Sequence, residues 1–196
     1  MFLLEKSEIN TLMRAKQYTL CLLVSVFGLF SCIDDNGLSE EEKREREGLI
    51  KVGNHVPSFT VYDDNGDSFS STEFIGKRSL LLFFDIICGD CRREFAIIDK
   101  VWNRLKDDPD FCMITISRVT ANKTREQDIV AINEHWELKG YTMPKYFDEN
   151  RQVYNLFARL YVPRIYLIDA QGVVKWAAVE KFDTSVDQLV DKIKAL

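Results

Sequence analysis

Large apolar residues gather in two runs near the middle of the chain. The first covers Ser79–Ile87, between Gly76 and Gly89, and the second covers Phe111–Ser117. Runs of this length with few charges predict strands that are buried on both faces. Between the two runs the apolar spacing changes to three and four residues, which predicts an amphipathic helix. The helical positions are Phe95, Ile98, Val101, Trp102 and Leu105.

Shorter periodic segments flank this strand–helix–strand unit. Residues 59–62 and 67–70 are predicted strands joined by an Asn-Gly turn, which gives an N-terminal hairpin. Residues 164–169 and 173–178 predict a second hairpin, and Asp183–Leu196 predicts a closing helix. Further predicted elements are helices at about 125–137 and 152–160 and a short strand at 145–147. This order predicts an α/β domain with a central mixed sheet, flanking helices and an added N-terminal β-hairpin.

The N-terminal region has a different pattern. Residues 19–30 form one apolar run preceded by Arg14 and Lys16. The run is shorter than the roughly twenty residues that a membrane-spanning helix needs. A basic flank, a short apolar run and then small residues are typical of an export signal. We therefore expect the folded domain to leave the cytoplasm.

The apolar run ends in Leu29-Phe30-Ser31-Cys32, which resembles the end of a bacterial lipoprotein signal. We predict that residues 1–32 are a signal peptide and that Cys32 is the lipidated residue. A plain cleaved signal and an uncleaved anchor are the alternatives. Met13 opens the basic segment directly, so the start stays open between Met1 and Met13.

A charged stretch separates the signal from the predicted domain. Residues 33–52 include Ser39–Gly48, which is dense in Glu, Lys and Arg. This composition predicts a solvated helix or tether, and the domain is then residues 53–196. With 46% hydrophobic and 29% charged residues, the chain has the composition of a globular protein with one core. Its net charge of −5 argues against a nucleic-acid partner, because such proteins normally present a basic face.

Two of the five cysteines are close together, at Cys88 and Cys91, where a predicted buried strand gives way to a helix. Free backbone N–H groups and the helix dipole stabilise an anion at such a helix start, so a thiolate forms there near neutral pH. A second cysteine three positions on can close a small disulfide. The pattern predicts a redox pair that needs no metal and no other cofactor.

Three other roles for this pair fit the sequence less well. A zinc site normally has four ligands, and neither His55 nor His135 falls at a finger-like spacing. Covalent haem needs a histidine directly after the second cysteine, where this chain has Arg92. A purely structural disulfide rarely lies at a junction from strand to helix.

From Gly53 onward the chain resembles the TlpA/ResA-like branch of the thioredoxin superfamily, which are extracytoplasmic thiol–disulfide oxidoreductases. The resemblance rests on four separated motifs. These are HVPSF at 55–59, FIGK at 74–77, CGDCRREF at 88–95 and VPRIYLIDAQG at 162–172. It implies a thioredoxin-like fold. It also implies that Cys88 attacks, that Cys91 resolves, and that Pro163 is a cis-proline facing the pair. The backbone of Val162 would then offer strand-like hydrogen bonds to a substrate, whereas an ordinary trans-proline at a strand start is the alternative.

Glu94 matches a glutamate that assists proton transfer in ResA-like members, and a carboxylate near the pair would raise a thiol pKa. Glutamate is also common in the second turn of a helix. Asp85 interrupts the apolar strand; we expect it to face solvent, the alternative being a second titrating group beside the pair. We expect Cys112 to be a small buried apolar residue. Trp102, Trp136 and Trp176 are expected to be core or half-buried packing residues.

The predicted function is disulfide exchange with protein thiols, in the reducing direction, because Asp90 and Glu94 both destabilise a thiolate at Cys88. Arg92 and Arg93 oppose this effect. A peroxiredoxin-like peroxidase is one alternative, although Asp85 stands where such enzymes need Thr or Ser. A non-catalytic binding lipoprotein with a thioredoxin fold is the other.

The expected partners are protein thiol or disulfide substrates, an upstream membrane or periplasmic electron donor, and a membrane held through the lipid anchor. The expected location is the cell envelope, facing the periplasm, with outer-membrane or surface exposure as a variant. Asp34 and Asp35 after Cys32 resemble an acidic tag for surface lipoproteins.

Overall fold

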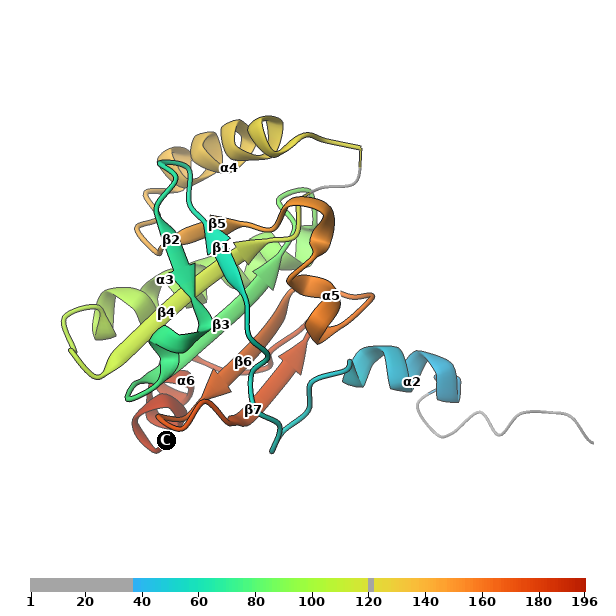
Figure 1. Ribbon diagram of the computed structural model, residues 1–196, viewed down its shortest axis with the longest axis vertical. Coiled ribbons are helices and arrows are strands. Elements are labelled where there is room, and N and C mark those ends of the chain that lie inside the picture. The colour runs from blue at the N-terminus through green and yellow to red at the C-terminus, as the bar shows by residue number, and fades with distance from the viewer. Residues whose placement is uncertain (1–36, 120–121) are drawn as a thin grey trace, which may run out of the picture. The chain divides into compact units, whose positions relative to one another are not determined.

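The computed structural model describes residues 37–119 and 122–196 (Figure 1). Residues Lys43–Leu196 form one compact unit. The predicted signal peptide, with Cys32 and both candidate start residues, lies outside the described residues. Within the described residues, no helix is both long enough and apolar enough to cross a membrane.

The described elements alternate strands and helices along the chain. The strands are β1 (Thr60–Tyr62), β2 (Ser68–Ser70), β3 (Arg78–Phe84), β4 (Phe111–Ser117), β5 (Lys145–Phe147), β6 (Arg164–Ile168) and β7 (Val174–Val179). The helices are α2 (Glu40–Glu47), α3 (Gly89–Leu105), α4 (Arg125–Lys139), α5 (Tyr154–Phe157) and α6 (Val186–Lys194). Two 3-10 turns, η2 (Ser71–Phe74) and η3 (Glu149–Arg151), complete them.

The strands form one mixed sheet in the order β2-β1-β5-β4-β3-β6-β7. β3 runs parallel to β4 and antiparallel to β6, so the two apolar runs lie side by side at the centre. The predicted N-terminal hairpin is β1–β2, and it joins the sheet through an antiparallel contact between β1 and β5. The predictions of a central mixed sheet and of an added hairpin are confirmed.

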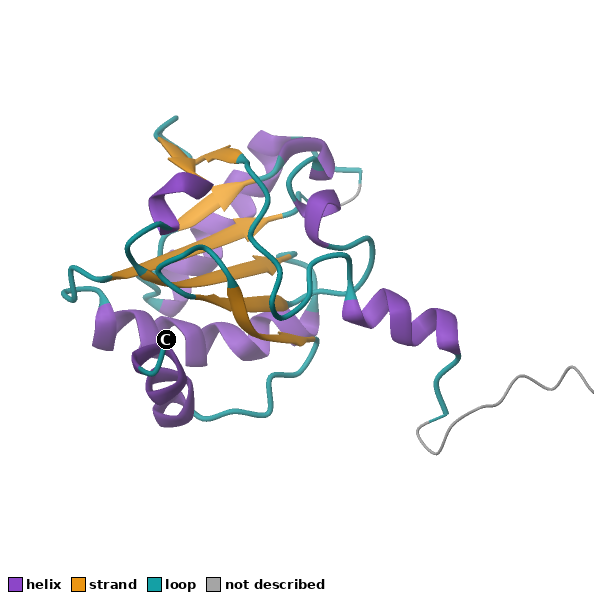
Figure 2. Ribbon diagram, turned by 60° about the horizontal axis from the view of Figure 1, so that its bottom comes forward, coloured by secondary structure: helices purple, strands orange, loops and turns teal. Residues whose placement is uncertain are grey.

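Helices cover both faces of this sheet (Figure 2). Successive residues of a strand point to opposite faces, and the end of β3 shows this directly. Phe83 packs on Phe157 of α5, with ring centroids 4.8 Å apart, whereas Phe84 packs edge-on against Phe95 of α3 at 5.0 Å. Trp136 of α4 stacks on Phe84 at 5.6 Å. The helix that follows the cysteine pair is thus held against the central strand by large aromatic contacts.

Two predicted elements are shorter than the apolar pattern suggested. The strand predicted over 79–87 ends at Phe84, because the Asp85 side chain accepts a hydrogen bond from the backbone N–H of Ile87 at 3.1 Å and turns the chain. The helix predicted over 152–160 is reduced to α5, and Ala158 is already extended. The backbone carbonyls of residues 159–161, which follow α5, accept hydrogen bonds from the side chains of Arg151, Tyr154 and Arg164.

Arg164, the first residue of β6, ties the end of α2 to the sheet. Its guanidinium is almost fully buried and donates to the carbonyls of Glu45, Arg46 and Glu47 at 3.1, 2.8 and 3.2 Å. The last carbonyls of a helix lack partners within it, and a positive charge is favourable there. Gly48 follows with a φ of +77°, and a Cβ at that position would lie 2.8 Å from the guanidinium.

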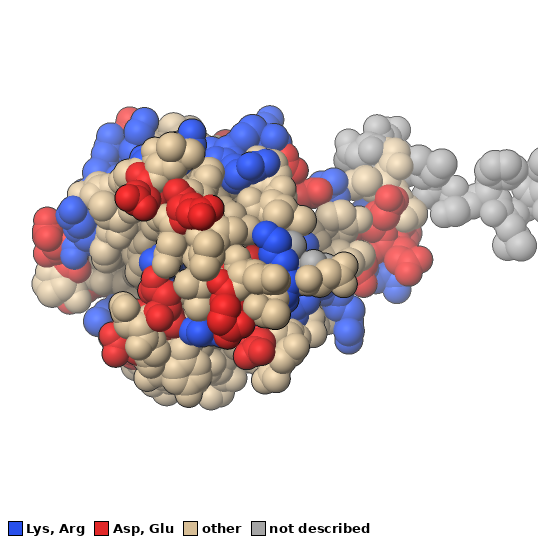
Figure 3. Space-filling model, turned by 90° about the horizontal axis from the view of Figure 1, so that it is seen from above, with Lys and Arg blue, Asp and Glu red and all other residues tan. Residues whose placement is uncertain are grey.

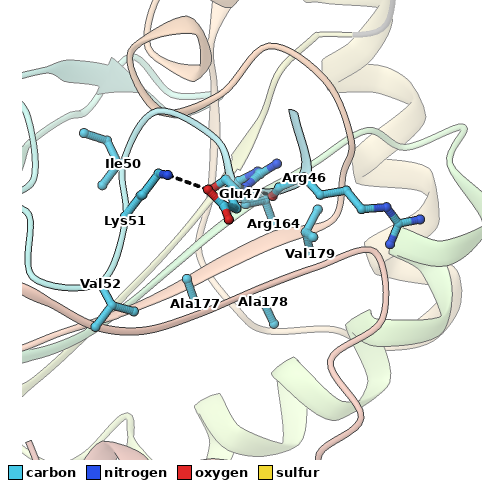
Figure 4. A pocket seen from close by; sticks show the side chains of 9 residues that line it. All are labelled: Arg46, Glu47, Ile50, Lys51, Val52, Arg164, Ala177, Ala178 and Val179. Carbon is cyan, nitrogen blue, oxygen red and sulfur yellow. Dashed lines mark hydrogen bonds and ion pairs between the residues drawn. The ribbon is translucent and has the colours of Figure 1, made fainter. Parts of the chain in front are cut away.

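A hollow of about 220 Å³ lies beside this contact, next to β7 (Figure 4). Figure 4 shows the ion pair between Glu47 and Lys51 at its edge. The hollow is lined by Arg46, Glu47, Ile50, Lys51, Val52, Arg164, Ala177, Ala178 and Val179. Neither cysteine of the pair contributes to it.

Acidic and basic side chains are interspersed on the face of the molecule seen in Figure 3. The ion pairs of the described residues include that of Lys145 with Asp64 at 3.0 Å. This face carries both signs of charge and no continuous basic area.

Candidate active site

Cys88 is the N-cap residue of α3, directly after the turn that ends β3. Its backbone N–H donates to the carbonyl of Asp85 at 3.0 Å, which closes the turn. The Cys88 side chain accepts a hydrogen bond from the backbone N–H of Cys91 at 3.5 Å. Sulfur thus occupies the position where helix N-caps normally place an oxygen.

The two cysteines of the pair differ sharply in exposure. Cys91 is fully buried, whereas Cys88 is only partly buried. The backbone N–H of Asp85 approaches the Cys91 sulfur at 3.5 Å. Burial raises the pKa of the Cys91 thiol well above its ordinary range, and the charges of Cys88 and Asp85 raise it further. Cys88 is therefore the sulfur that a partner molecule can reach, and Cys91 is held as a protonated thiol behind it.

Asp85 does not face solvent, contrary to the expectation from sequence. It is 6% exposed, and its carboxylate lies 3.8 Å from the guanidinium of Arg118. Burial of the carboxylate is tolerated because the Ile87 N–H and the arginine face it. Asp85 instead lies beside the cysteine pair, which is the alternative placement.

Arg118 is a residue of this site that sequence reasoning missed. It follows β4, and its backbone N–H donates to the carbonyl of Phe84 at 3.0 Å, at the end of the neighbouring strand. The parallel register that pairs Phe84 with Ser117 places Arg118 beside Asp85. The sequence does show a charged residue directly after each of the two buried strands. That these two residues are neighbours follows only once the register of the strands is known.

The Val162–Pro163 peptide bond is cis, as the resemblance implied. It lies just before β6, which neighbours β3 in the sheet. The Cys88 thiol donates to the carbonyl of Val162 at 3.5 Å, so the proline segment and the first cysteine are in direct contact. Two apolar side chains near this contact are exposed, Ile87 at 60% and Leu160 at 49%.

Glu94 lies on α3 but faces the segment between β7 and α6. It is largely buried, and burial raises the pKa of its carboxyl, while the backbone N–H of Phe182 and the charges of Arg93 and Lys181 act in the opposite direction. One of its carboxylate oxygens has no hydrogen-bond partner. Its role in proton transfer stays a prediction, since its described neighbours are residues 181–183.

Cys112 belongs to a different part of the sheet. The register of β3 and β4 pairs it with Ser79, at the opposite end of β3 from the cysteine pair. It is half-buried against the core, and burial raises its pKa to about 11. Trp136 is buried, and Trp102 and Trp176 are half-buried against the core, as expected. Among the described residues, no group of three or more His, Cys, Asp or Glu side chains is arranged to hold a metal ion.

Residues 51–193 match the Redoxin protein family. The chain is similar to the thiol-disulfide oxidoreductase ResA of Bacillus subtilis (strain 168), with 23% identity over 146 residues, which are 74% of this chain and 77% of the relative.

Among solved structures, a putative protein disulfide isomerase from Bacteroides thetaiotaomicron has a TM-score of 0.66 and 24% identity, over 75% of this chain and 90% of the other. A secreted disulfide oxidoreductase of Mycobacterium tuberculosis has a TM-score of 0.56 and 20% identity, over 70% of this chain and 96% of the other. These likenesses show a thioredoxin-like fold.

Proposed function

The chain belongs to the Redoxin family and is a TlpA/ResA-like thiol–disulfide oxidoreductase, and from that premise we propose that Cys88 and Cys91 exchange disulfides with protein thiols outside the cytoplasm. One observation carries the proposal. A reachable cysteine caps α3 and contacts the carbonyl of Val162, while its partner thiol is buried one turn along the helix.

The proposed reaction proceeds in two thiol–disulfide exchanges. The Cys88 thiolate attacks one sulfur of a substrate disulfide, the substrate S–S bond breaks, and the released substrate thiolate takes up a proton. Cys91 then loses its proton and attacks the sulfur of Cys88 in the mixed disulfide, which frees the second substrate thiolate. Two electrons pass from the enzyme dithiol to the substrate, and an external dithiol donor must reduce the Cys88–Cys91 disulfide again.

The second step needs a proton acceptor, because the pKa of Cys91 is raised by burial. Glu94 and Asp85 are the two carboxylates proposed for this task. The charge of Asp85 acts on the Cys91 thiol and raises its pKa, whereas Glu94 has an unpartnered oxygen and a raised pKa of its own.

We propose that the enzyme works in the reducing direction. A dithiol whose thiolates are poorly stabilised gives up its electrons more readily, and strong oxidants are those with a stabilised reduced form. Burial raises the pKa of Cys91 and so disfavours its thiolate, which favours the reducing direction. Asp90 contributes less than the sequence suggested, because it forms an ion pair with Arg93. A redox titration tests this proposal: a midpoint near that of dedicated disulfide-forming oxidants, about −120 mV, would contradict it.

The proposed location is the cell envelope, with residues 1–32 as a signal, Cys32 lipidated, residues 33–52 as a tether and the domain facing the periplasm. The signal pattern supports this, and a structurally similar protein is described as secreted. Metabolic labelling with a palmitate analogue tests it, with Cys32→Ser expected to abolish the label. Cys21→Ser, in the same apolar run, is the matched control and should keep the label. If Cys32→Ser kept the label, lipidation at Cys32 would be contradicted.

Reduction of insulin in the presence of dithiothreitol tests the proposed activity. We expect Cys88→Ser to lower turnover by at least about a thousandfold, because no other described cysteine is both reachable and at a helix N-terminus. Cys112→Ser should retain wild-type turnover. Wild-type turnover in Cys88→Ser would contradict the proposal, and rapid peroxide consumption by Cys91→Ser would favour a peroxidase.

A further inference from the structure

The carbonyls of residues 159–162, which lead into the cis-proline, are each held by a side chain. We call residues 159–163 the proline loop. Arg151 donates to the carbonyl of Arg159 at 2.8 Å, and Arg164 donates to that of Leu160 at 3.3 Å. The hydroxyl of Tyr154 lies 2.7 Å from the carbonyl of Leu160 and 2.8 Å from that of Tyr161. Cys88 contacts the carbonyl of Val162.

Tyr154 is the central member of this set. It is fully buried, and its single hydroxyl proton is shared between two consecutive carbonyls of the proline loop. The guanidinium groups of Arg118 and Arg151 lie 5.4 and 5.3 Å from the centre of its ring. Phe83 packs edge-on against it, with centroids 5.3 Å apart. The ring is therefore held by the sheet and by two cations, so its hydroxyl has a defined position.

The backbone of Tyr154 is anchored as firmly as its ring. Asp148 is nearly fully buried, and its carboxylate accepts hydrogen bonds from the N–H groups of Val153 and Tyr154 at 2.9 and 2.6 Å. The N–H of Asp148 in turn donates to the carbonyl of Ser117, at the end of β4, at 2.8 Å. A continuous set of hydrogen bonds thus runs from the central sheet to the proline loop.

The proline loop needs such support because its own backbone is strained. Tyr161 has a φ of +65°, in the left-handed region that residues with a Cβ seldom adopt. Such a conformation persists only where the surroundings impose it. The Tyr154 hydroxyl bonds to the carbonyl of the strained residue itself and to the carbonyl before it.

We propose that Tyr154 is a positioning residue that sets the orientation of the proline loop, so that the backbone of Val162 is presented beside Cys88 to an extended polypeptide substrate. This inference rests on the proposed function of the cysteine pair. A polypeptide that bonds to the Val162 backbone depends on that orientation, whereas a small disulfide or dithiol needs only the sulfur of Cys88. Tyr154 therefore discriminates in favour of protein substrates.

The test is Tyr154→Phe, which removes the hydroxyl and keeps the ring between the two arginines. We expect kcat/KM for insulin reduction to fall about tenfold, mainly through KM, as for one lost buried hydrogen bond. The rate at which dithiothreitol reduces the Cys88–Cys91 disulfide should stay within about twofold of the wild-type rate. The midpoint potential of the pair should equal that of the wild type. A defect in folding alone would affect both kinds of reaction.

Tyr166→Phe is the matched control. Tyr166 is a fully buried tyrosine of β6, and its hydroxyl, unlike that of Tyr154, donates to no carbonyl of the proline loop. We expect this variant to retain wild-type KM for insulin. Arg151→Met, which removes the bond to the carbonyl of Arg159, should raise KM for insulin in the same selective way and by a smaller factor. It serves as the second variant if Tyr154→Phe is unstable.

An equal loss on insulin and dithiothreitol, or no loss on insulin in either loop variant, would overturn the proposal. These outcomes differ from those expected if the proposed function were wrong. If it were wrong, the wild-type protein would fail to reduce insulin, or Cys88→Ser would reduce insulin as fast as the wild type.

Discussion

The two ends of the central strand β3 each have a half-buried cysteine nearby, and the two cysteines have different surroundings. Cys112 lies within the ladder of β4 beside Ser79, at the start of β3. Cys88 follows the other end, where the chain turns at Asp85, starts α3 and meets the carbonyl of Val162. Similar exposure therefore does not give similar chemistry. What differs is the presence of a helix N-terminus, a buried partner thiol and the proline loop.

The largest expected difference between the two ends is in the pH dependence of thiol labelling. Iodoacetamide reacts with the thiolate, and the pKa of Cys112 is raised to about 11. We expect its labelling rate to increase about tenfold per pH unit between pH 8 and 10. Cys91 should remain unlabelled over this range in the folded protein, because it is fully buried with a raised pKa.

Peptide mass spectrometry after timed labelling measures each cysteine separately. Cys88 should be labelled first at neutral pH. If Cys112 were labelled as fast as Cys88 at pH 7, the contrast between the two ends of β3 would be wrong.

The second contrast concerns the polar residue at each end of β3. Asp85→Ala removes the acceptor for the Ile87 N–H and leaves Arg118 without its carboxylate. We expect the free energy of unfolding to fall by about 2 kcal/mol. Ser79→Ala removes only a 3.3 Å hydrogen bond to the carbonyl of Lys77, and should cost less than about 1 kcal/mol.

Urea unfolding followed by tryptophan fluorescence measures both changes. Asp85→Asn keeps an acceptor oxygen for the turn and should recover part of the loss. If Ser79→Ala were the more destabilising variant, the turn at Asp85 would not be the stronger constraint.

The smallest expected effect concerns Glu94, whose carboxyl has a raised pKa because it is buried. The folded state then binds the proton more tightly than the unfolded chain. The ionised carboxylate costs stability above its folded pKa, and the cost shrinks as the pH falls from that value toward the pKa of the unfolded chain. We expect Glu94→Gln to raise Tm by a few degrees at pH 7.

This gain should vanish below the ordinary carboxyl pKa of 4.5, where Glu94 is protonated in both states. Thermal unfolding at several pH values measures it. A lower Tm for Glu94→Gln at pH 7 would mean that the ionised carboxylate stabilises the fold.

Local signals in the sequence were sufficient for the centre of the fold and for the position of the pair. The apolar runs that became β3 and β4 need no long-range information, and a helix start after a buried strand places Cys88 at its N-cap. The motif at 162–172 was sufficient for the cis-proline because a family resemblance supplied the context.

Contacts between distant segments were beyond the reach of these patterns. The burial of Asp85 depends on Arg118, which is near it only through the register of two parallel strands. The early end of α5 depends on carbonyls that bond to Tyr154 and Arg164 rather than to the helix. Neither is visible in the spacing of apolar residues, because that spacing does not show which side chain meets which polar group.

Trapping of the mixed disulfide shows directly whether Cys88 attacks and Cys91 resolves. Cys91→Ser and Cys88→Ser, each in reduced form, are incubated with a protein disulfide, quenched with acid and analysed by mass spectrometry. We expect Cys91→Ser to accumulate a mixed disulfide joined at Cys88, and Cys88→Ser to accumulate none, because Cys88 is the reachable sulfur and Cys91 is buried. A mixed disulfide joined at Cys91 or Cys112 would show that this assignment of the two cysteines is wrong.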